Sequence, residues 1–265
     1  MPDDSHISLV DALASFKPVS LEEMDSVKLM NRVDSKYLTN EATLLEILGD
    51  AEKAGYRVLV TDGNRINPYD SMYFDTDDLR MFQDHRNGKL VRQKVRTRTY
   101  LSSGLAYLEI KRKNNKGRTN KKRTRIPVDE FSDFRRDSNA DEYLARHSWF
   151  TKDDLSPVLE TQFNRITLVN PAMTERVTID TCLVFKNARN GITASLKNAV
   201  IIELKQDGRA SSQMKEIFMA HRVKPVRVSK YCMAVTLTEP DARPGRFRLK
   251  VRKIEKIINQ KITVK

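Results

Sequence analysis

The chain has 265 residues, with 48 Lys and Arg against 35 Asp and Glu, a net charge of +13, and 39% hydrophobic residues. This length is enough for one domain with a substantial core, and no apolar run approaches the roughly 20 residues that a membrane-spanning helix needs. The excess of cations predicts an anionic partner, which could be nucleic acid, a membrane surface or a phosphorylated small molecule.

The cysteines and histidines exclude two common kinds of small site. Cys182 and Cys232 lie far apart, and the four histidines have no metal-binding spacing. We therefore expect neither a disulfide framework nor a zinc site. The acidic N-terminus lacks the apolar core of a secretory signal, so we expect a protein of the reducing cytoplasm.

The first part of the chain carries clear helix boundaries. Ser20 and Glu23 form a predicted capping box, Asn40 is suited to cap a helix, and Gly55 is suited to end it. In chain order we predict an irregular segment and a short helix within residues 1–27, a strand over 31–38, a helix over 41–54 and a strand over 56–62.

The remainder of the chain is rich in strand patterns. Asn87-Gly88 is a strong turn signal, and it is followed by strand-like runs joined by turns at Gly104 and Gly117. Many strands joined by short turns, with separate helices, predict an α+β fold with a mainly antiparallel sheet. In chain order we predict strands over 71–74, 89–100, 106–113 and 120–128, a helix over 129–147, strands over 158–169, 175–185 and 199–206, a helix capped by Ser211, and a last segment over 226–238.

Residues 239–265 form a basic tail. Its apolar residues recur at near-helical spacing among Lys and Arg, which predicts an amphipathic helix. Such a helix could lie on an anionic membrane, it could pack over one end of the barrel, or the tail could be loosely ordered.

Basic residues occupy alternate positions along several predicted strands. Because successive side chains point to opposite faces of a strand, Lys94, Arg96 and Arg98 share one face, and Val91 and Val95 lie on the other. The same alternation occurs in five further strands and places these groups on the charged face: Arg32, Asp34 and Lys36; Glu109, Lys111 and Lys113; Lys121, Arg123 and Arg125; Arg176 and Asp180; Glu203 and Lys205.

Two structures are compatible with this alternation. In an open sheet the charged face would be solvated. In a closed antiparallel β-barrel of about eight strands with peripheral helices, the cations would line a tunnel and require a polyanion, because isolated buried charges are costly. The few carboxylates on this face, Glu109 and Glu203 among them, could then hold a divalent cation. On this hypothesis the phosphate-binding residues include Arg32, Lys94, Lys113, Lys121, Arg123 and Arg176.

At these residues the sequence resembles the VTC domain, the polyphosphate polymerase domain of the triphosphate tunnel metalloenzyme (CYTH-like) superfamily, over roughly residues 28–238. The motifs that carry the resemblance are Arg32-x-Asp34-x-Lys36-Tyr37, Tyr73-Phe74-Asp75-Thr76, Lys94-x-Arg96-x-Arg98-x-Tyr100, Glu109-x-Lys111-x-Lys113, Arg165, Thr178-x-Asp180, Glu203-x-Lys205 and Ser229-Lys230-Tyr231.

The resemblance implies a phosphotransferase that uses ATP to elongate polyphosphate in a tunnel barrel. It implies Mn²⁺ or Mg²⁺ held by Glu203, catalytic contacts to phosphate from Lys36, Arg96, Arg98, Lys111 and Lys205, and further phosphate contacts from Arg165 and Lys230. Arg32 and Asp34 stand where the wider superfamily often has two glutamates, so a fully acidic two-metal site is not expected.

Three other functions are compatible with the same residues. With water as the acceptor, the site would be a metal-dependent triphosphatase, and without turnover it would be a polyphosphate-binding module. A nucleic-acid-binding protein is disfavoured, because only 7% of the residues are aromatic and the cations follow a strand period. The sequence does not indicate an oligomeric state.

Overall fold

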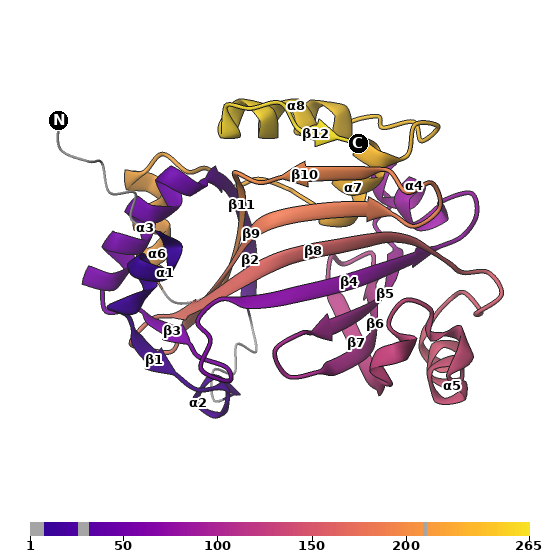
Figure 1. Ribbon diagram of the computed structural model, residues 1–265, viewed down its shortest axis with the longest axis horizontal. Coiled ribbons are helices and arrows are strands. Elements are labelled where there is room, and N and C mark those ends of the chain that lie inside the picture. Colours follow the sequence, from indigo (N-terminus) through magenta and orange to yellow (C-terminus); the bar gives the residue numbers. More distant parts are fainter. Residues whose placement is uncertain (1–7, 26–31, 209–210) are drawn as a thin grey trace.

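The structure is a computed structural model that describes residues 8–25, 32–208 and 211–265. Within these ranges twelve strands form one strongly curved sheet, and eight α-helices pack around it (Figure 1). The strands are β1 (Lys17–Val19), β2 (Arg32–Asn40), β3 (Arg57–Leu59), β4 (Asn67–Asp75), β5 (Arg92–Tyr100), β6 (Leu105–Lys113), β7 (Thr119–Ile126), β8 (Ser156–Val169), β9 (Glu175–Asn187), β10 (Thr193–Leu196), β11 (Ala199–Asp207) and β12 (Thr263–Val264). The helices are α1 (Leu9–Ala14), α2 (Leu21–Asp25), α3 (Glu41–Lys53), α4 (Arg80–Arg86), α5 (Ser138–His147), α6 (Gln213–Ala220), α7 (Lys230–Thr238) and α8 (Phe247–Ile258).

Eight of the strands form a continuous antiparallel run in the order β2-β11-β9-β8-β4-β5-β6-β7. The α+β class and the antiparallel sheet are confirmed, but the predicted closure is not: no backbone ladder joins β2 to β7 within the described ranges. The free edge of β2 is occupied instead, because Tyr37 bridges to Pro225 and the carbonyl of Lys36 accepts from the Val226 N–H at 2.7 Å. The connection between α6 and α7 therefore covers the edge that closure would need.

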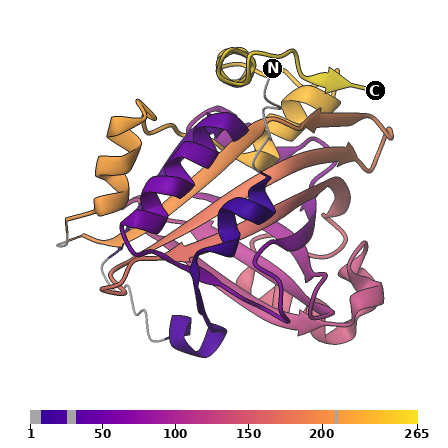
Figure 2. The same cartoon turned by 60° about the vertical axis from the view of Figure 1, so that its left-hand side comes forward.

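The convex face of the sheet is apolar and covered by helices. Helices α1, α3 and α6 pack on the outward residues of β8, β9 and β11, such as Ile166, Ile179 and Ile202. Helix α5 packs over the outward residues of β5 and β6, including Val95 and Leu108. Figure 2 shows the first group of helices lying across the strands. Burial of these outward positions turns the alternate, charged positions toward the concave side.

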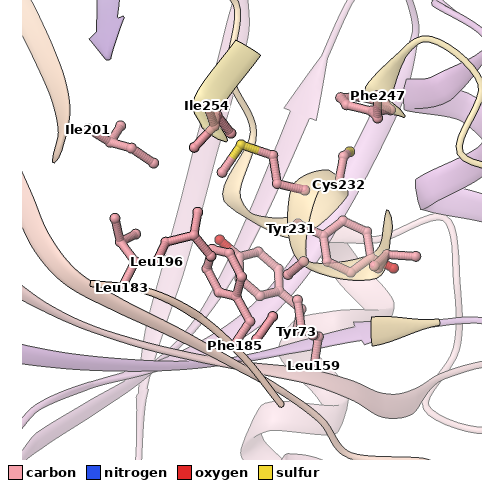
Figure 3. Close-up of a cluster of buried hydrophobic side chains, with 14 of the residues drawn as sticks. Tyr73, Leu159, Leu183, Phe185, Leu196, Ile201, Tyr231, Cys232, Phe247 and Ile254 are labelled. Atoms are coloured by element: carbon pink, nitrogen blue, oxygen red, sulfur yellow. The ribbon is translucent and has the colours of Figure 1, made fainter. Parts of the chain in front are cut away.

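Helix α7 fills one end of the concave side. Its residues Tyr231, Met233 and Ala234 are buried in one apolar cluster with strand residues such as Phe163 and Ile201 (Figure 3). Helix α8 packs on the same cluster through Phe247, Ile254 and Ile258. One end of the concave face is therefore closed by apolar packing.

Three predicted segments differ from the structure. Residues 8–19 are not irregular but contain α1 and β1; Ser8 and Asp11 form a capping box that the sequence analysis missed. Residues 129–147 contain two 3-10 turns (Val128–Glu130 and Phe134–Arg136) before α5, because Asp133 and Asp137 each accept a backbone hydrogen bond that starts a new element. Ser212 rather than Ser211 caps α6, since its hydroxyl accepts from Lys215 N.

The other predicted elements are present with shifted ends, and α4 and β10 are additional. The predicted capping box of Ser20 and Glu23 and the Asn40 cap are confirmed by their hydrogen bonds. The predicted amphipathic helix of the tail is α8, packed over one end of the sheet. Among the described helices, none has the length and apolar content to cross a membrane.

Candidate functional site

The alternating cations of the sequence lie on the concave face. The strand register aligns Lys36 with Glu203 and Thr178, and aligns Lys94 with Lys111 and Lys121 across β5, β6 and β7. Opposite residues in an antiparallel ladder point to the same side. Each row therefore carries its charged groups onto one surface, opposite the apolar residues that the helices cover.

Charges from the two ends of the sheet act on each other across this concave face. Lys111 lies on β6 and Lys36 on β2, and these strands do not pair. Partial desolvation lowers the pKa of Lys111 to about 8, and repulsion from Lys36 adds to the effect. Burial also lowers the pKa of Lys94, with a further contribution from Lys36. The curvature of the sheet thus brings the cations of β2, β5 and β6 around a common space.

Arg98 is the most deeply buried cation of this face. Its side chain is 6% exposed, and its Nε donates to the Ser71 hydroxyl at 3.1 Å. Its guanidinium carbon lies 5.4 Å from the centre of the Tyr69 ring, within cation–π range. Burial lowers the pKa of Arg98, and repulsion from Arg96 lowers it further. Within the described ranges no carboxylate lies within ion-pair distance of Arg98.

Arg165, Asp180 and Lys230 form a tight ion cluster beside α7. Arg165 donates to both Asp180 oxygens, at 2.6 and 2.8 Å, and Lys230 donates to the same carboxylate. Burial alone would raise the pKa of Asp180, but these two cations hold it well below its ordinary range. Burial lowers the pKa of Lys230 to about 8, against the opposing attraction of Asp180. Two cations share one carboxylate, so the cluster keeps a net positive charge.

A second cluster is built around Glu109, which is 2% exposed. Arg96 donates to Glu109 Oε2 at 2.6 and 2.8 Å, and Lys121 pairs with Oε1. Both carboxylate oxygens are therefore engaged by cations. The predicted role of Glu109 as a metal ligand would require these cations to move away, and it stays a prediction.

Tyr73 stands next to this second cluster, and the sequence analysis did not place it in the site. Its hydroxyl accepts from Arg96 Nη1 at 3.0 Å, and its ring stacks on Tyr231 of α7. Burial alone would raise the pKa of Tyr73, but the surrounding cations, led by Arg96 and Lys94, lower it to about 7. The concave face thus contains a phenol that titrates near neutral pH.

Glu203 and Lys205 form a third cluster on β11. Lys205 Nζ lies 2.5 Å from Glu203 Oε1 and 3.7 Å from Asp34 Oδ2. Burial alone would raise the pKa of Glu203, but Lys36 and Lys205 hold it well below its ordinary range, so the carboxylate stays ionised. Nowhere in the described chain do three Asp, Glu, His or Cys side chains group as metal ligands would. Glu203 could hold a divalent cation only with oxygens that a ligand supplies, which is how Mg²⁺ is commonly bound with phosphates.

The N-terminus of α7 points into the concave face. Ser229 caps the helix by accepting from Cys232 N, and Lys94 Nζ donates to the same hydroxyl at 2.9 Å. The helix is held there by Tyr231, whose hydroxyl donates to the buried Asp75 carboxylate. The Tyr73-Phe74-Asp75-Thr76 and Ser229-Lys230-Tyr231 motifs therefore meet in space. Their proximity explains why the sequence carries both.

The structure brings most of the predicted site residues to one face but leaves some at its margin. Arg123 is exposed on the outermost strand β7, over the Tyr107 ring, and Lys113 lies at the end of β6 opposite Arg92. Arg176 faces Lys205 in the register of β9 and β11. The side chain of Arg32 lies outside the described part of the chain. Tyr73 and Ser229 could have been found from their motifs, since both belong to the segments that carry the family resemblance.

Comparisons with known proteins agree with this architecture. A family model described as the VTC domain matches residues 31–238. No curated protein matches the chain.

Several solved structures resemble the fold. A Bacillus halodurans protein described as a candidate adenylate cyclase is 13% identical, with a TM-score of 0.50 over 76% of this chain and 96% of that chain. A candidate adenylyl cyclase from Hippeastrum, described as having a dominant triphosphatase activity, is 11% identical, with a TM-score of 0.47 over 77% of this chain and 95% of that chain. A Pyrococcus horikoshii protein is also 11% identical, with a TM-score of 0.40 over 77% of this chain and 98% of that chain. At such identities the likeness concerns the fold alone.

Proposed function

The chain belongs to the VTC domain family, and on this premise we propose that its concave face binds a chain of phosphates and transfers the γ-phosphoryl group of ATP to polyphosphate. The observation that carries the proposal is Arg98, a guanidinium that is 6% exposed and has a hydroxyl and aromatic rings as its neighbours. A buried cation without a counter-ion is costly. An anionic ligand would remove that cost, and a linear polyanion could serve the neighbouring cations at the same time.

Phosphoryl transfer asks mainly for alignment and charge neutralisation. We assign Arg98 and Arg165 to the alignment of phosphate oxygens, because guanidinium groups make two-pronged contacts with phosphate and both are stacked over Tyr69 at 5.4 and 4.9 Å. Lys36, Lys111 and Lys205 would neutralise charge that develops on the transferred group. The acceptor is the terminal phosphate of a polyphosphate chain, which is already anionic, so no strong general base is required.

Tyr73 has a role in this scheme that follows from its position. Its hydroxyl is fixed by Arg96 beside the cations that would contact the phosphates. A phenol in this place can donate a hydrogen bond to a phosphate oxygen, and the ligand's negative charge would favour the protonated form. We therefore assign Tyr73 to positioning the phosphate chain, with Arg96 held in place by Glu109.

Among the acids that the structure describes on the concave face, Glu203 suits a divalent cation best. This carboxylate stays ionised and faces the common space, whereas both oxygens of Glu109 are engaged by Arg96 and Lys121. When bound with phosphate oxygens, Mn²⁺ or Mg²⁺ would neutralise charge on the donor. Lys205, 2.5 Å from Glu203, would have to move toward the ligand for the carboxylate to bind a metal.

Hydrolysis of a triphosphate is the second candidate, and one observation favours it. Apolar packing of α7 closes one end of the concave face, which limits the path of a long chain and suits a short substrate. With water as the acceptor, the same cations would hold tripolyphosphate. The two reactions therefore differ in the acceptor and not in the residues that bind the donor.

The experiment incubates the purified protein with ATP and Mn²⁺ and measures long polyphosphate by gel, with release of free phosphate from tripolyphosphate measured in parallel. We expect chain growth for the native protein. Glu203→Ala and Lys205→Ala should abolish turnover while circular dichroism stays unchanged. Arg98→Ala should weaken polyphosphate binding by about 10- to 100-fold, the usual value of a hydrogen bond to a charged group.

The matched control is Lys53→Ala, which removes an exposed lysine from an ion pair with Asp50 on α3. It should leave both reactions unchanged. Phosphate release from tripolyphosphate without chain growth would mean that the protein is a hydrolase and not a polymerase. Tight polyphosphate binding without either product would leave a binding module, and native turnover in both the Glu203 and Lys205 variants would refute the site.

A further inference from the structure

The C-terminal segment carries a concentration of charge that the proposed reaction does not use. The family model ends at residue 238. Residues 242–265 contain nine Lys and Arg and a single acid, Glu255. Most of this charge belongs to α8, which lies along one side of the molecule beside β12 (Figure 1).

The structure fixes α8 firmly to the rest of the protein. Its residues Phe247, Ile254 and Ile258 are buried against α7 and the sheet. At its C-terminal end, the Asn40 side chain donates to the Ile257 carbonyl at 3.0 Å, and the Asn198 side chain donates to the Ile258 carbonyl at 3.2 Å. The apolar face of the helix is therefore already used, and its opposite face has a fixed direction.

That opposite face is a cationic stripe. Arg248, Arg252 and Lys256 are exposed and recur every four residues, so they lie one above the other along the helix, with Lys253 beside them. Leu249, which is 68% exposed, stands within this stripe. This face thus combines a high positive charge with a largely exposed apolar side chain, and an anionic bilayer surface offers a favourable contact to both.

We propose that the outward face of α8 docks on the surface of an anionic lipid bilayer. The cations would contact lipid phosphates, and Leu249 would enter the interface between headgroups and acyl chains. A polyphosphate chain or a nucleic-acid backbone would also attract the cations, but neither offers an apolar layer for an aliphatic side chain. The exposed leucine therefore favours the lipid surface.

Docking through α8 is compatible with access to the concave face. Helix α8 packs on α7, and α7 fills one end of that face. The membrane would therefore lie on the side of the closed end, and the other end would remain open to water. This docking surface is independent of the reaction proposed above, since none of its residues belongs to the concave face.

The experiment measures co-sedimentation of the full-length protein with vesicles of phosphatidylcholine alone and with 30% phosphatidylglycerol, at about 0.1 M salt. We expect binding to the anionic vesicles only. A cation near an anionic surface contributes about fivefold in partitioning, so Lys253→Gln combined with Lys256→Gln should weaken binding about 30-fold. Leu249→Ala should weaken it further without changing the charge.

Two matched variants test whether the effect belongs to α8. Lys116→Gln combined with Arg118→Gln removes two exposed charges from the turn between β6 and β7, and Met219→Ala removes an apolar side chain that is 76% exposed on α6. Neither should alter vesicle binding, and ATP turnover should be native in all four variants. Three results would each overturn the proposal. The turn variant could lose as much vesicle binding as the α8 variant, or the native protein could bind neutral vesicles as well as anionic ones. The α8 variant could also lose binding to polyphosphate and keep binding to vesicles.

Discussion

Lys and Arg gather in two regions of the molecule, and the two regions differ in burial and in ion pairing. On the concave face Arg98 is buried, Arg96, Arg165, Lys205 and Lys230 are mostly covered, and the acids Glu109, Asp180 and Glu203 lie in ion pairs. On α8 Arg248, Arg252, Lys253 and Lys256 are exposed to water, with Glu255 as the single acid of the helix. Lys and Arg thus form fixed ion-pair clusters on the concave face and a solvent-exposed positive surface on α8.

The difference follows from the local dielectric environment. Charges surrounded by protein interact more strongly than charges in water, so their pKa values shift and their partners become necessary. Exposed charges are screened by solvent and salt, and their pairs contribute little. The two proposals follow the same division: the geometry of paired cations would select a phosphate chain on the concave face, whereas exposed positive charge and one exposed leucine would attract an anionic bilayer to α8.

The largest expected effect contrasts a buried ion pair with an exposed one. Arg96→Ala leaves the Glu109 carboxylate, 2% exposed, without its main partner and should lower the free energy of unfolding by roughly 3–5 kcal/mol. Arg146→Ala removes the Arg146–Glu142 pair, whose side chains are 73% and 70% exposed, and should cost less than about 0.5 kcal/mol. Urea unfolding measures both.

The double variant Arg96→Ala with Glu109→Ala provides the control for this contrast. It also removes the Glu109 carboxylate that Arg96→Ala leaves without its main partner, so it should be more stable than Arg96→Ala alone. Equal losses for Arg96→Ala and Arg146→Ala would mean that the concave face is as well solvated as the surface, and the comparison between the two regions would fail.

The next effect concerns pH between 7 and 9, where three concave-face groups have lowered pKa values. The pKa of Tyr73 is about 7 instead of 10.0, and the pKa values of Lys111 and Lys230 are about 8 instead of 10.5. In this range the unfolded chain therefore binds more protons than the folded one, so stability should rise with pH, by on the order of 2–4 kcal/mol. Phosphate affinity should fall over the same range, because Lys230 loses its charge and Tyr73 becomes anionic.

Tyr73→Phe separates the tyrosine contribution to this pH dependence from that of the two lysines. It should flatten the rise in stability near pH 7 and leave the part above pH 8 that belongs to Lys111 and Lys230. Cys232 sets the upper limit of the pH range over which stability should rise. Burial raises its pKa from 9.0, so above pH 9 its contribution makes stability fall with pH. Stability that falls between pH 7 and 9 would contradict the lowered pKa values of Tyr73, Lys111 and Lys230.

The sequence analysis predicted the composition of the concave face well, because alternation along a strand is a local property. Lys94, Arg96 and Arg98 share a face in any strand, but the apolar residues between them left open whether that face is solvated or lines a tunnel. What alternation cannot predict is pairing between distant strands. Arg165 pairs with Asp180, and Glu109 pairs with Arg96 and Lys121, across strands whose register the alternation does not give.

The failed expectation of closure has the same origin. Whether β2 and β7 pair depends on what reaches their free edges, and Pro225 and Val226 reach β2 from a connection without a strand pattern. The helical state of residues 230–238 was also left open, because α7 is buried on nearly all sides and lacks an amphipathic pattern. Tertiary contacts, which a local pattern does not encode, decide both features.

The smallest expected effect compares two arginines that stack on aromatic rings in the two environments. Arg112 lies on the outward face of β6, next to the inward Lys111, with its guanidinium carbon 4.6 Å from the centre of the ring of Trp149, which is 45% exposed. An exposed cation–π contact contributes about 0.5–1 kcal/mol, so Arg112→Ala should cost no more than this.

Trp149 is the single tryptophan of the chain, so its fluorescence reports on this contact directly. Arg112→Ala should shift the emission to longer wavelength, because water replaces the guanidinium over the ring, and should leave ATP turnover unchanged. Arg98→Ala, at 5.4 Å from the Tyr69 ring, should do the reverse: reduced turnover with an unchanged tryptophan spectrum. If Arg112→Ala reduced turnover as strongly as Arg98→Ala, the outward face of β6 would belong to the functional surface, and the two faces of the sheet could not be assigned separate roles.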